Sequence, residues 1–236
     1  MQSRPNTLLR MKNIPDPDGK IIVEYAYHVK LRAPFLAIGA AVWKVLTNNL
    51  MKPCACDGVQ TMHTIDPFTM YRTYSRPGNS SAAALHANIV LKHFVEAERE
   101  VIVWRSIVDD ELHPNMRDEY VHDETGWMQI SPVSPETCRF TLLVQYTAYS
   151  DFLDPQTSVH ETLKSAITLF EESTLSESSF DQGTFPRTPE TCEEDMLDLT
   201  FVKQTILRRG KRLEWMIENV INNVVKSYQV NSTSAM

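Results

Sequence analysis

Hydrophobic and polar residues alternate regularly near the start of the chain. Between residues 20 and 31 the odd positions carry Ile, Val, Tyr and Leu, while the even positions include Lys, Glu and His. This period of two predicts a half-buried β-strand. After Pro34 the apolar residues recur at helical intervals, which predicts a helix over residues 35–49. These apolar residues are Leu36, Ala40, Trp43 and Leu46.

A series of short strand candidates follows, separated by Pro, Gly, Asn and Asp. They cover residues 59–65, 69–75, 84–95, 100–108, 127–131 and 139–149. Connections as short as these favour antiparallel pairing of neighbouring strands. We therefore predict an antiparallel meander after the first helix.

The C-terminal segment, residues 196–228, predicts a long helix. Its second half carries one wide apolar stripe at spacings of three and four. Such a stripe is more typical of a helix that closes one side of a sheet than of a membrane-surface helix. The order strand, helix, strands, long helix is the helix-grip arrangement, an α+β fold.

The chain length favours one domain, which we predict over residues 19–228, with flexible termini at 1–18 and 229–236. Residues 154–195 are acidic and rich in Ser and Thr, so we expect a partly disordered insertion there. The N-terminus lacks the apolar core of a secretory signal, and no uncharged stretch near it is long enough to span a bilayer. We therefore predict a cytoplasmic protein with its cysteines as free thiols.

Charge and motifs argue against several classes of function. The net charge is −7, and we interpret the one basic run as a solvated helix face, so direct nucleic-acid binding is disfavoured. That run is Arg208, Arg209, Gly210, Lys211 and Arg212. No nucleophile elbow, phosphate loop or zinc-protease motif occurs. Cys54, Cys56 and His63 lack a second ligand pair at zinc spacing, so we predict no metal site and no cofactor.

Arg105 is the main candidate for a ligand contact. It lies in an apolar strand, where a buried guanidinium requires hydrogen-bond acceptors. If Val101 and Val103 face inward, Arg105 faces a cavity and can hold a ligand hydroxyl or carboxylate. If the strand is shifted by one residue, it faces water. A structural ion pair is the other alternative, and its candidate partners are Glu96, Glu98, Glu100 and Asp109.

Four more side chains are candidates for the same pocket. They are His93, Tyr25, Tyr27 and Tyr146. His93 interrupts an apolar strand face, and each tyrosine combines an apolar ring with a hydroxyl group. Ordinary core packing explains all four equally well or better. No catalytic residue is predicted.

Several short segments resemble START-like domains. START domains show an Arg-acid pair at the start of one strand, an Arg near its end, and a Gly-aromatic pair that opens the next strand. Arg99-Glu100, Arg105 and Gly126-Trp127 stand at these positions. The chain is especially similar to a START-like set from oomycete proteins described as mating-specific. The best-defined matching segments are residues 33–35, 41–46, 94–99, 103–106, 126–127 and 216–219.

The resemblance implies a curved antiparallel sheet of about seven strands wrapped around the C-terminal helix. It also implies an internal tunnel that binds a lipid or sterol without catalysis, for transport or sensing, and leaves room for transient membrane contact. Two alternatives stay open. One is a regulatory protein-interaction domain with a degenerate cavity, and the other is a cyclase-like or hydrolase-like enzyme of the same fold.

Overall fold

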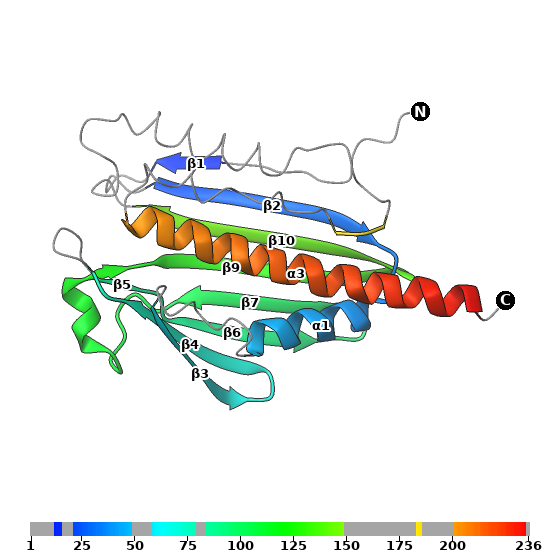
Figure 1. The fold of residues 1–236 in the computed structure, drawn as a ribbon, viewed down its shortest axis with the longest axis horizontal. Coiled ribbons are helices and arrows are strands. Elements are labelled where there is room, and N and C mark those ends of the chain that lie inside the picture. The colour runs from blue at the N-terminus through cyan, green and yellow to red at the C-terminus, as the bar shows by residue number, and fades with distance from the viewer. Residues whose placement is uncertain are drawn as a thin grey trace.

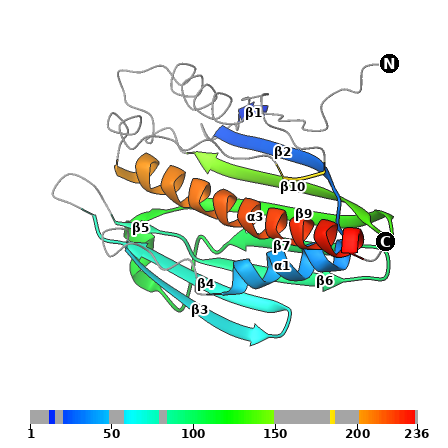
Figure 2. The same ribbon diagram turned by 45° about the vertical axis from the view of Figure 1, so that its right-hand side comes forward.

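The computed structural model describes residues 12–15, 21–48, 58–78, 84–148, 183–185 and 201–234. Within these ranges one ten-stranded sheet forms, and two helices pack on the same face of it (Figures 1 and 2). The helices are α1 (Phe35–Thr47) and α3 (Phe201–Ser234). The expected insertion at 154–195 lies outside the described residues, except for residues 183–185.

The strands follow the meander that the sequence predicts. Their bounds are β1 Lys12–Pro15, β2 Ile21–Leu31, β3 Val59–Asp66, β4 Thr69–Arg76, β5 Leu85–His86, β6 Ile89–Val95, β7 Glu100–Ser106, β8 Tyr120–Val121, β9 Asp123–Ser134 and β10 Thr137–Ala148. A short 3-10 helix, η1, spans Pro114–Asp118. The sheet order is β1-β2-β10-β9-β7-β6-β4-β5-β8, and β3 pairs with the outer side of β4.

The predicted α+β helix-grip fold is confirmed, with more strands than expected. The segment over residues 84–95 is divided into β5 and β6 at Ala87 and Asn88, and the short strands β1 and β8 gave no sequence signal. All pairings are antiparallel except that of β5 with β8. Helix α3 continues past the predicted end to Ser234, and β1 lies within the N-terminal segment that we expected to be flexible.

The core lies between the inner face of the sheet and the two helices. Alternate residues of each central strand point inward, as the strand period requires. The register aligns them in rows across the sheet. One such row contains Leu142, Met128, Ile102 and His93. From α3, Ile217, Ile221 and Val225 are buried against this face.

Helix α1 approaches the sheet closely at Gly39. A Cβ atom at this position would lie 2.0 Å from Glu100 Oε2, so only glycine fits. Glu100 is itself buried and pairs with His93, whose Nε2 lies 2.8 Å from Glu100 Oε2. A buried hydrogen-bonded pair therefore lies directly beneath the helix.

Residues 183–185, which we call the 183–185 anchor, contact the core beside β2 and β10. The Gly183 carbonyl accepts a hydrogen bond from the Arg32 amide at 2.9 Å. The Asn222 side chain bonds both backbone groups of Phe185, at 2.7 and 3.1 Å. The Phe185 ring is 3% exposed and packs edge-on against Phe140. The anchor thus joins β2, β10 and α3.

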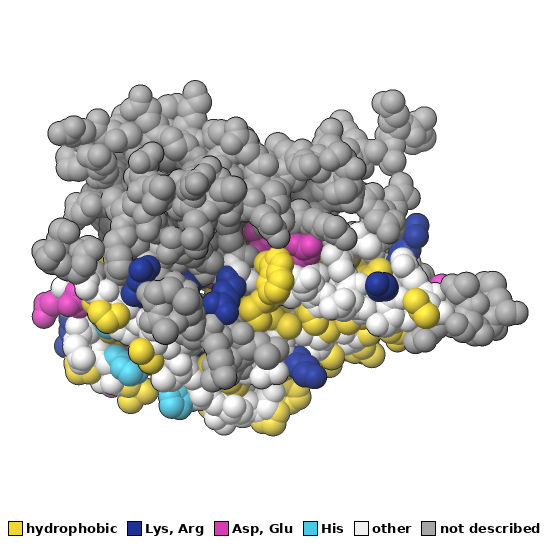
Figure 3. Space-filling view, viewed as in Figure 1, with side chains coloured by type: hydrophobic (Ala, Val, Ile, Leu, Met, Phe, Trp, Pro, Cys, Tyr) yellow, Lys and Arg dark blue, Asp and Glu magenta, His cyan; other side chains and the backbone are white. Residues whose placement is uncertain are grey.

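The surface over the two helices carries apolar side chains. Figure 3 shows hydrophobic groups gathered along the described face where α1 and α3 lie. The large exposed hydrophobic residues on these helices are Leu36, Trp215, Tyr228 and Val230. Among the described residues, neither helix is both long and apolar enough to cross a membrane.

Candidate functional site

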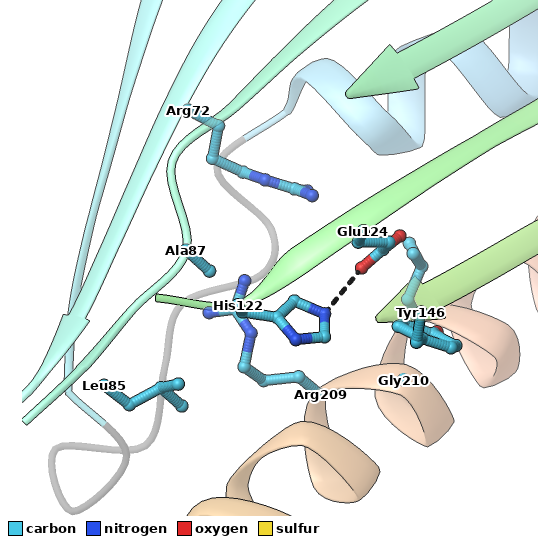
Figure 4. Close-up of a pocket in the computed structure, with 9 residues that line it drawn as sticks. Arg72, Leu85, Ala87, His122, Glu124, Tyr146, Arg209 and Gly210 are labelled. Atoms are coloured by element: carbon cyan, nitrogen blue, oxygen red, sulfur yellow. Dashed lines mark hydrogen bonds and ion pairs between the residues drawn. The ribbon is translucent and has the colours of Figure 1, made fainter. Parts of the chain in front are cut away.

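A polar cavity lies between α3 and one end of the inner sheet face (Figure 4). Its volume is about 30 Å³, which gives room for roughly two water molecules. The lining residues are Arg72, Leu85, Ala87, His122, Glu124, Tyr146, Arg209, Gly210 and Leu213. The cavity therefore has the size of a polar head group and not of a whole sterol or phospholipid, whose pocket would measure roughly 300 Å³ or more.

Strand register brings most of the polar side chains together. Tyr146 on β10 stands opposite Glu124 on β9, and Arg72 on β4 stands opposite Ile89 on β6. The Glu124 amide donates to the Ser106 hydroxyl at 2.9 Å, which joins β9 to the end of β7. One inward row across the sheet thus runs from Tyr146 to Arg72, and α3 adds Arg209 from above.

The tryptophan beside this row depends on Gly126. A Cβ atom at Gly126 would lie 2.2 Å from the Trp104 ring, so the indole occupies the space that a side chain would fill. Trp104 Nε1 then donates a hydrogen bond to Glu124 Oε1 at 2.5 Å. Gly126 therefore positions the indole, and the indole helps to fix the carboxylate.

His122 and Glu124 are hydrogen-bonded inside the cavity, with 3.1 Å between His122 Nε2 and Glu124 Oε2. Burial acts to raise the pKa of Glu124. The hydrogen bond and charge of His122, with the Trp104 hydrogen bond, outweigh burial and lower that pKa. Glu124 is therefore a carboxylate at neutral pH. The other ring nitrogen, His122 Nδ1, is buried and has no hydrogen-bond partner.

Two arginines line the same cavity, of which Arg72 is buried and Arg209 half-buried. Burial, reinforced by the nearby charge of Arg209, lowers the pKa of Arg72 to about 10. Burial also lowers the pKa of Arg209, whose guanidinium lies 3.6 Å from the centre of the Tyr74 ring. Figure 4 shows Arg72 entering from the sheet and Arg209 from α3. Both remain charged at neutral pH.

The interpretation of residues 208–212 as a solvated face is wrong for Arg209. This side chain points into the interface between α3 and the sheet, where the Tyr74 ring covers its guanidinium. Gly210, the next residue, also lines the cavity. The helix therefore turns part of its basic run inward.

Arg105 does not line the interior, and its predicted inward position is corrected. The inner face of β7 carries Ile102, Trp104 and Ser106, so Arg105 lies on the outer face. Its side chain is 58% exposed, and Nη2 lies 3.1 Å from Asp123 Oδ1. Because Val and Ile occur on both faces of this strand, the sequence could not decide its orientation. The ion-pair partner is none of the four acidic residues that we considered.

The other predicted site residues are spread over the interior. His93 is buried as predicted, but it lies beside Glu100 and the Trp43 ring, outside the cavity lining. The Tyr27 hydroxyl donates to Glu214 Oε1 at 2.9 Å. Tyr146 is the one predicted residue in the cavity lining. Tyr25 lies in β2, and its side chain is outside the described part of the structure.

Four site residues were missed, namely Arg72, His122, Glu124 and Arg209. Arg72 alternates with the apolar Met70 and the aromatic Tyr74, and this period of two could have indicated an arginine on the same face as these two residues. Similarly, Glu124 shares the phase of Gly126 and Met128. Their meeting across β4, β9 and α3 depends on the sheet order, which no local pattern gives.

The lining contains three side chains that can exchange a proton or act as a nucleophile, namely His122, Glu124 and Tyr146. Among the described residues, no group of three or more His, Cys, Asp or Glu side chains could hold a metal ion. Cys54 and Cys56, which we considered as metal ligands, lie outside the described residues.

Comparison with known proteins gives similar solved structures only. No protein-family profile and no curated protein matches the sequence. Human STARD10 is similar with a TM-score of 0.42 and 12% identity over 69% of this chain and 68% of that chain. Human StAR-related lipid transfer protein 5 is similar with a TM-score of 0.41 and 12% identity, over 69% of this chain and 83% of that chain. Zhui aromatase/cyclase from Streptomyces sp. R1128 is similar with a TM-score of 0.38 and 11% identity, over 87% of this chain and 94% of that chain. With TM-scores below 0.5, we draw no conclusion about this chain's ligand or activity from them.

Proposed function

We propose that the protein binds a small amphipathic ligand without catalysis, with the polar end of the ligand in the cavity between α3 and the sheet. The observation that supports this best is a cavity lined by charged side chains at the interface between α3 and the sheet, beside the apolar core. Each buried ion costs several kcal/mol of desolvation. Charges that served only to tie α3 to the sheet would be expected to close on one another without a gap of about 30 Å³.

The remaining lining accommodates the apolar part of such a ligand. Leu85, Ala87 and Leu213 form the hydrophobic part of the wall. A ligand much larger than the cavity needs α3 or the 183–185 anchor to move outward, since both fill the neighbouring core. A lipid or sterol, a role in transport or sensing, a cytoplasmic location, transient membrane contact and the oomycete-type relationship stay predictions from the sequence.

Native mass spectrometry tests the proposal. The purified protein is incubated with a total lipid extract and sprayed without denaturation, and we expect one bound molecule per chain. Arg105→Met is the matched control, because it removes an outer-face arginine and should leave the bound species unchanged. The absence of any adduct across sterols, phospholipids and fatty acids would contradict the proposal and favour the protein-interaction alternative.

A second candidate, an acid–base enzyme, is favoured by one observation. The His122–Glu124 pair lies beside Tyr146 in the cavity, and a carboxylate that orients a histidine is a common arrangement for a general base. If substrate is turned over, activity lost in His122→Gln and retained in His93→Gln would support the enzyme. Turnover that survives His122→Gln would eliminate this role.

A further inference from the structure

We propose that the cavity is a carboxylate site, in which Arg72, Arg209 and His122 hold the acid group of an amphipathic ligand. This inference rests on the proposed function and adds the chemical class of the ligand. It is carried by the charge balance of the lining, by a buried nitrogen without a partner, and by the size of the space.

The described lining residues carry more positive than negative charge. Among its nine residues there are two guanidiniums, Arg72 and Arg209, and one carboxylate, Glu124. The two guanidiniums repel each other, and Arg209 is one of the causes of the lowered pKa of Arg72. In a buried environment of low dielectric this repulsion is stronger than in water. A ligand anion between the two cations would relieve it.

His122 supplies a further polar contact. Its Nε2 faces Glu124, and because a carboxylate only accepts hydrogen bonds, Nε2 carries the proton of that bond. Nδ1 is then left buried without a partner in a side chain that is 6% exposed. When the ring carries a second proton, on Nδ1, this N–H can donate to a ligand oxygen. The cavity therefore contains a polar atom that a ligand can satisfy.

The space suits a carboxylate better than a phosphate. A cavity of about 30 Å³ holds roughly two water molecules, and a carboxylate has two oxygens where a phosphate has four. A planar guanidinium matches the two oxygens of a carboxylate with parallel hydrogen bonds. Leu85, Ala87 and Leu213 complete the wall with apolar surface, as a ligand with one acid group and an apolar body requires.

The experiment compares dodecanoate with dodecanol by isothermal titration calorimetry at neutral pH and fixed ionic strength. The two probes have the same chain and differ in the head group. We expect the wild-type protein to bind dodecanoate at least about tenfold more tightly. In Arg72→Met this preference should be lost, whereas Arg105→Met should keep it, because that arginine lies on the outer face.

Each other outcome has a definite meaning. Equal binding of dodecanoate and dodecanol by the wild type would overturn the carboxylate site and leave the proposed function standing. Binding of neither probe, with no lipid adduct in the mass spectrum, would overturn both. Dodecyl phosphate binding more tightly than dodecanoate would replace the carboxylate with a phosphate. If Arg72→Met is unfolded by circular dichroism, Arg209→Lys replaces it, because lysine keeps the positive charge but cannot make two parallel hydrogen bonds to a carboxylate. A reduced preference of Arg209→Lys for dodecanoate over dodecanol would support the carboxylate site, and an unchanged preference would contradict it.

Discussion

At the scale of single residues, two arginines in the same sheet have opposite environments. Arg72 is 5% exposed and lines the cavity, whereas the Arg105 side chain is 58% exposed and pairs with Asp123. The two environments differ because alternate residues of a strand face opposite sides of the sheet, so that a shift of one residue exchanges the inner and outer faces. A guanidinium is therefore a site candidate only once the phase of its strand is known.

Gly126 gives the sharpest stability prediction at this scale. Its missing side chain makes room for the Trp104 ring, and a Cβ would also lie 2.8 Å from the Leu143 carbonyl oxygen, which cannot move freely. Gly126→Ala should lower the free energy of unfolding by about 1–3 kcal/mol, the usual cost of overpacking. Urea unfolding followed by fluorescence measures it.

Gly210→Ala is the matched control for this prediction. A Cβ at Gly210 would meet nothing nearer than the Tyr146 hydroxyl at 3.9 Å, and the residue lies inside a helix. Alanine there should raise the free energy of unfolding by about 0.5–1 kcal/mol. If both substitutions change the free energy of unfolding by the same amount and in the same direction, the Trp104 contact is not what requires glycine at position 126.

The sequence could not always show which alternate residues of a strand face the core. The inner face of β6 was recognised because its odd residues, including Ile89, Leu91 and His93, are almost all apolar, and these three are buried. In β7 the inner Ile102 and Trp104 are matched by Val101 and Val103 outside, so alternation carried no information there. Residue propensity and the period of two therefore predicted where the strands lie. The face on which each polar side chain lies could be determined only from the packed structure.

Glu124 predicts how stability depends on pH. Its pKa in the folded protein is lower than its ordinary value of 4.5, so the carboxylate stabilises the fold above that value. This contribution is lost as the pH falls through the lower folded-state pKa. The free energy of unfolding should therefore decrease as the pH falls below 4.5 and through the lower folded-state pKa.

Glu124→Gln provides the comparison, because an amide does not titrate in this range. The variant should be less stable at neutral pH and should lose less of its free energy of unfolding on acidification. Chemical denaturation at a series of pH values measures both slopes. Parallel wild-type and variant slopes would show that Glu124 does not contribute to acid sensitivity.

At the scale of elements, glycines and a short anchor determine how the helices sit on the sheet. Helix α1 comes close enough to bury Glu100 because Gly39 has no side chain. Helix α3 is held by Asn222, which bonds both backbone groups of Phe185. Sequence periodicity predicted both helices, but an anchor from a polar segment could not be predicted, because its one buried aromatic has no periodic neighbours.

The anchor leads to a prediction for Phe185. Its ring is buried among the aromatic side chains of the core, at 5.5 Å between ring centres from Phe140 and 6.5 Å from Tyr27. Phe185→Ala should lower the free energy of unfolding by about 3–5 kcal/mol through the cavity that it leaves. Phe94→Ala, at a side chain that is 42% exposed, should change it by at most about 0.5 kcal/mol. Equal effects would contradict the packing of the anchor.

At the scale of the whole molecule, the apolar core and the polar cavity occupy different parts of one interface. The helix residues Ile217, Ile221 and Val225 pack against the sheet, while Arg209 and Gly210, earlier in the same helix, face the cavity. Element order was predictable because each strand and helix has a local signal. The site was not predictable, because its lining residues come from five separate segments that only the sheet order and the helix bring together.

Photolabelling tests the central claim, that the cavity between α3 and the sheet is where the ligand binds. A dodecanoate analogue with a diazirine beside its acid group is bound, irradiated and located by peptide mass spectrometry. We expect labels on inward residues of β4, β9 and β10 and on α3 near Arg209 and Leu213, and we expect excess dodecanoate to suppress them. Labels confined to the outer face around Arg105 or to the exposed Phe94 and Val95 would contradict it.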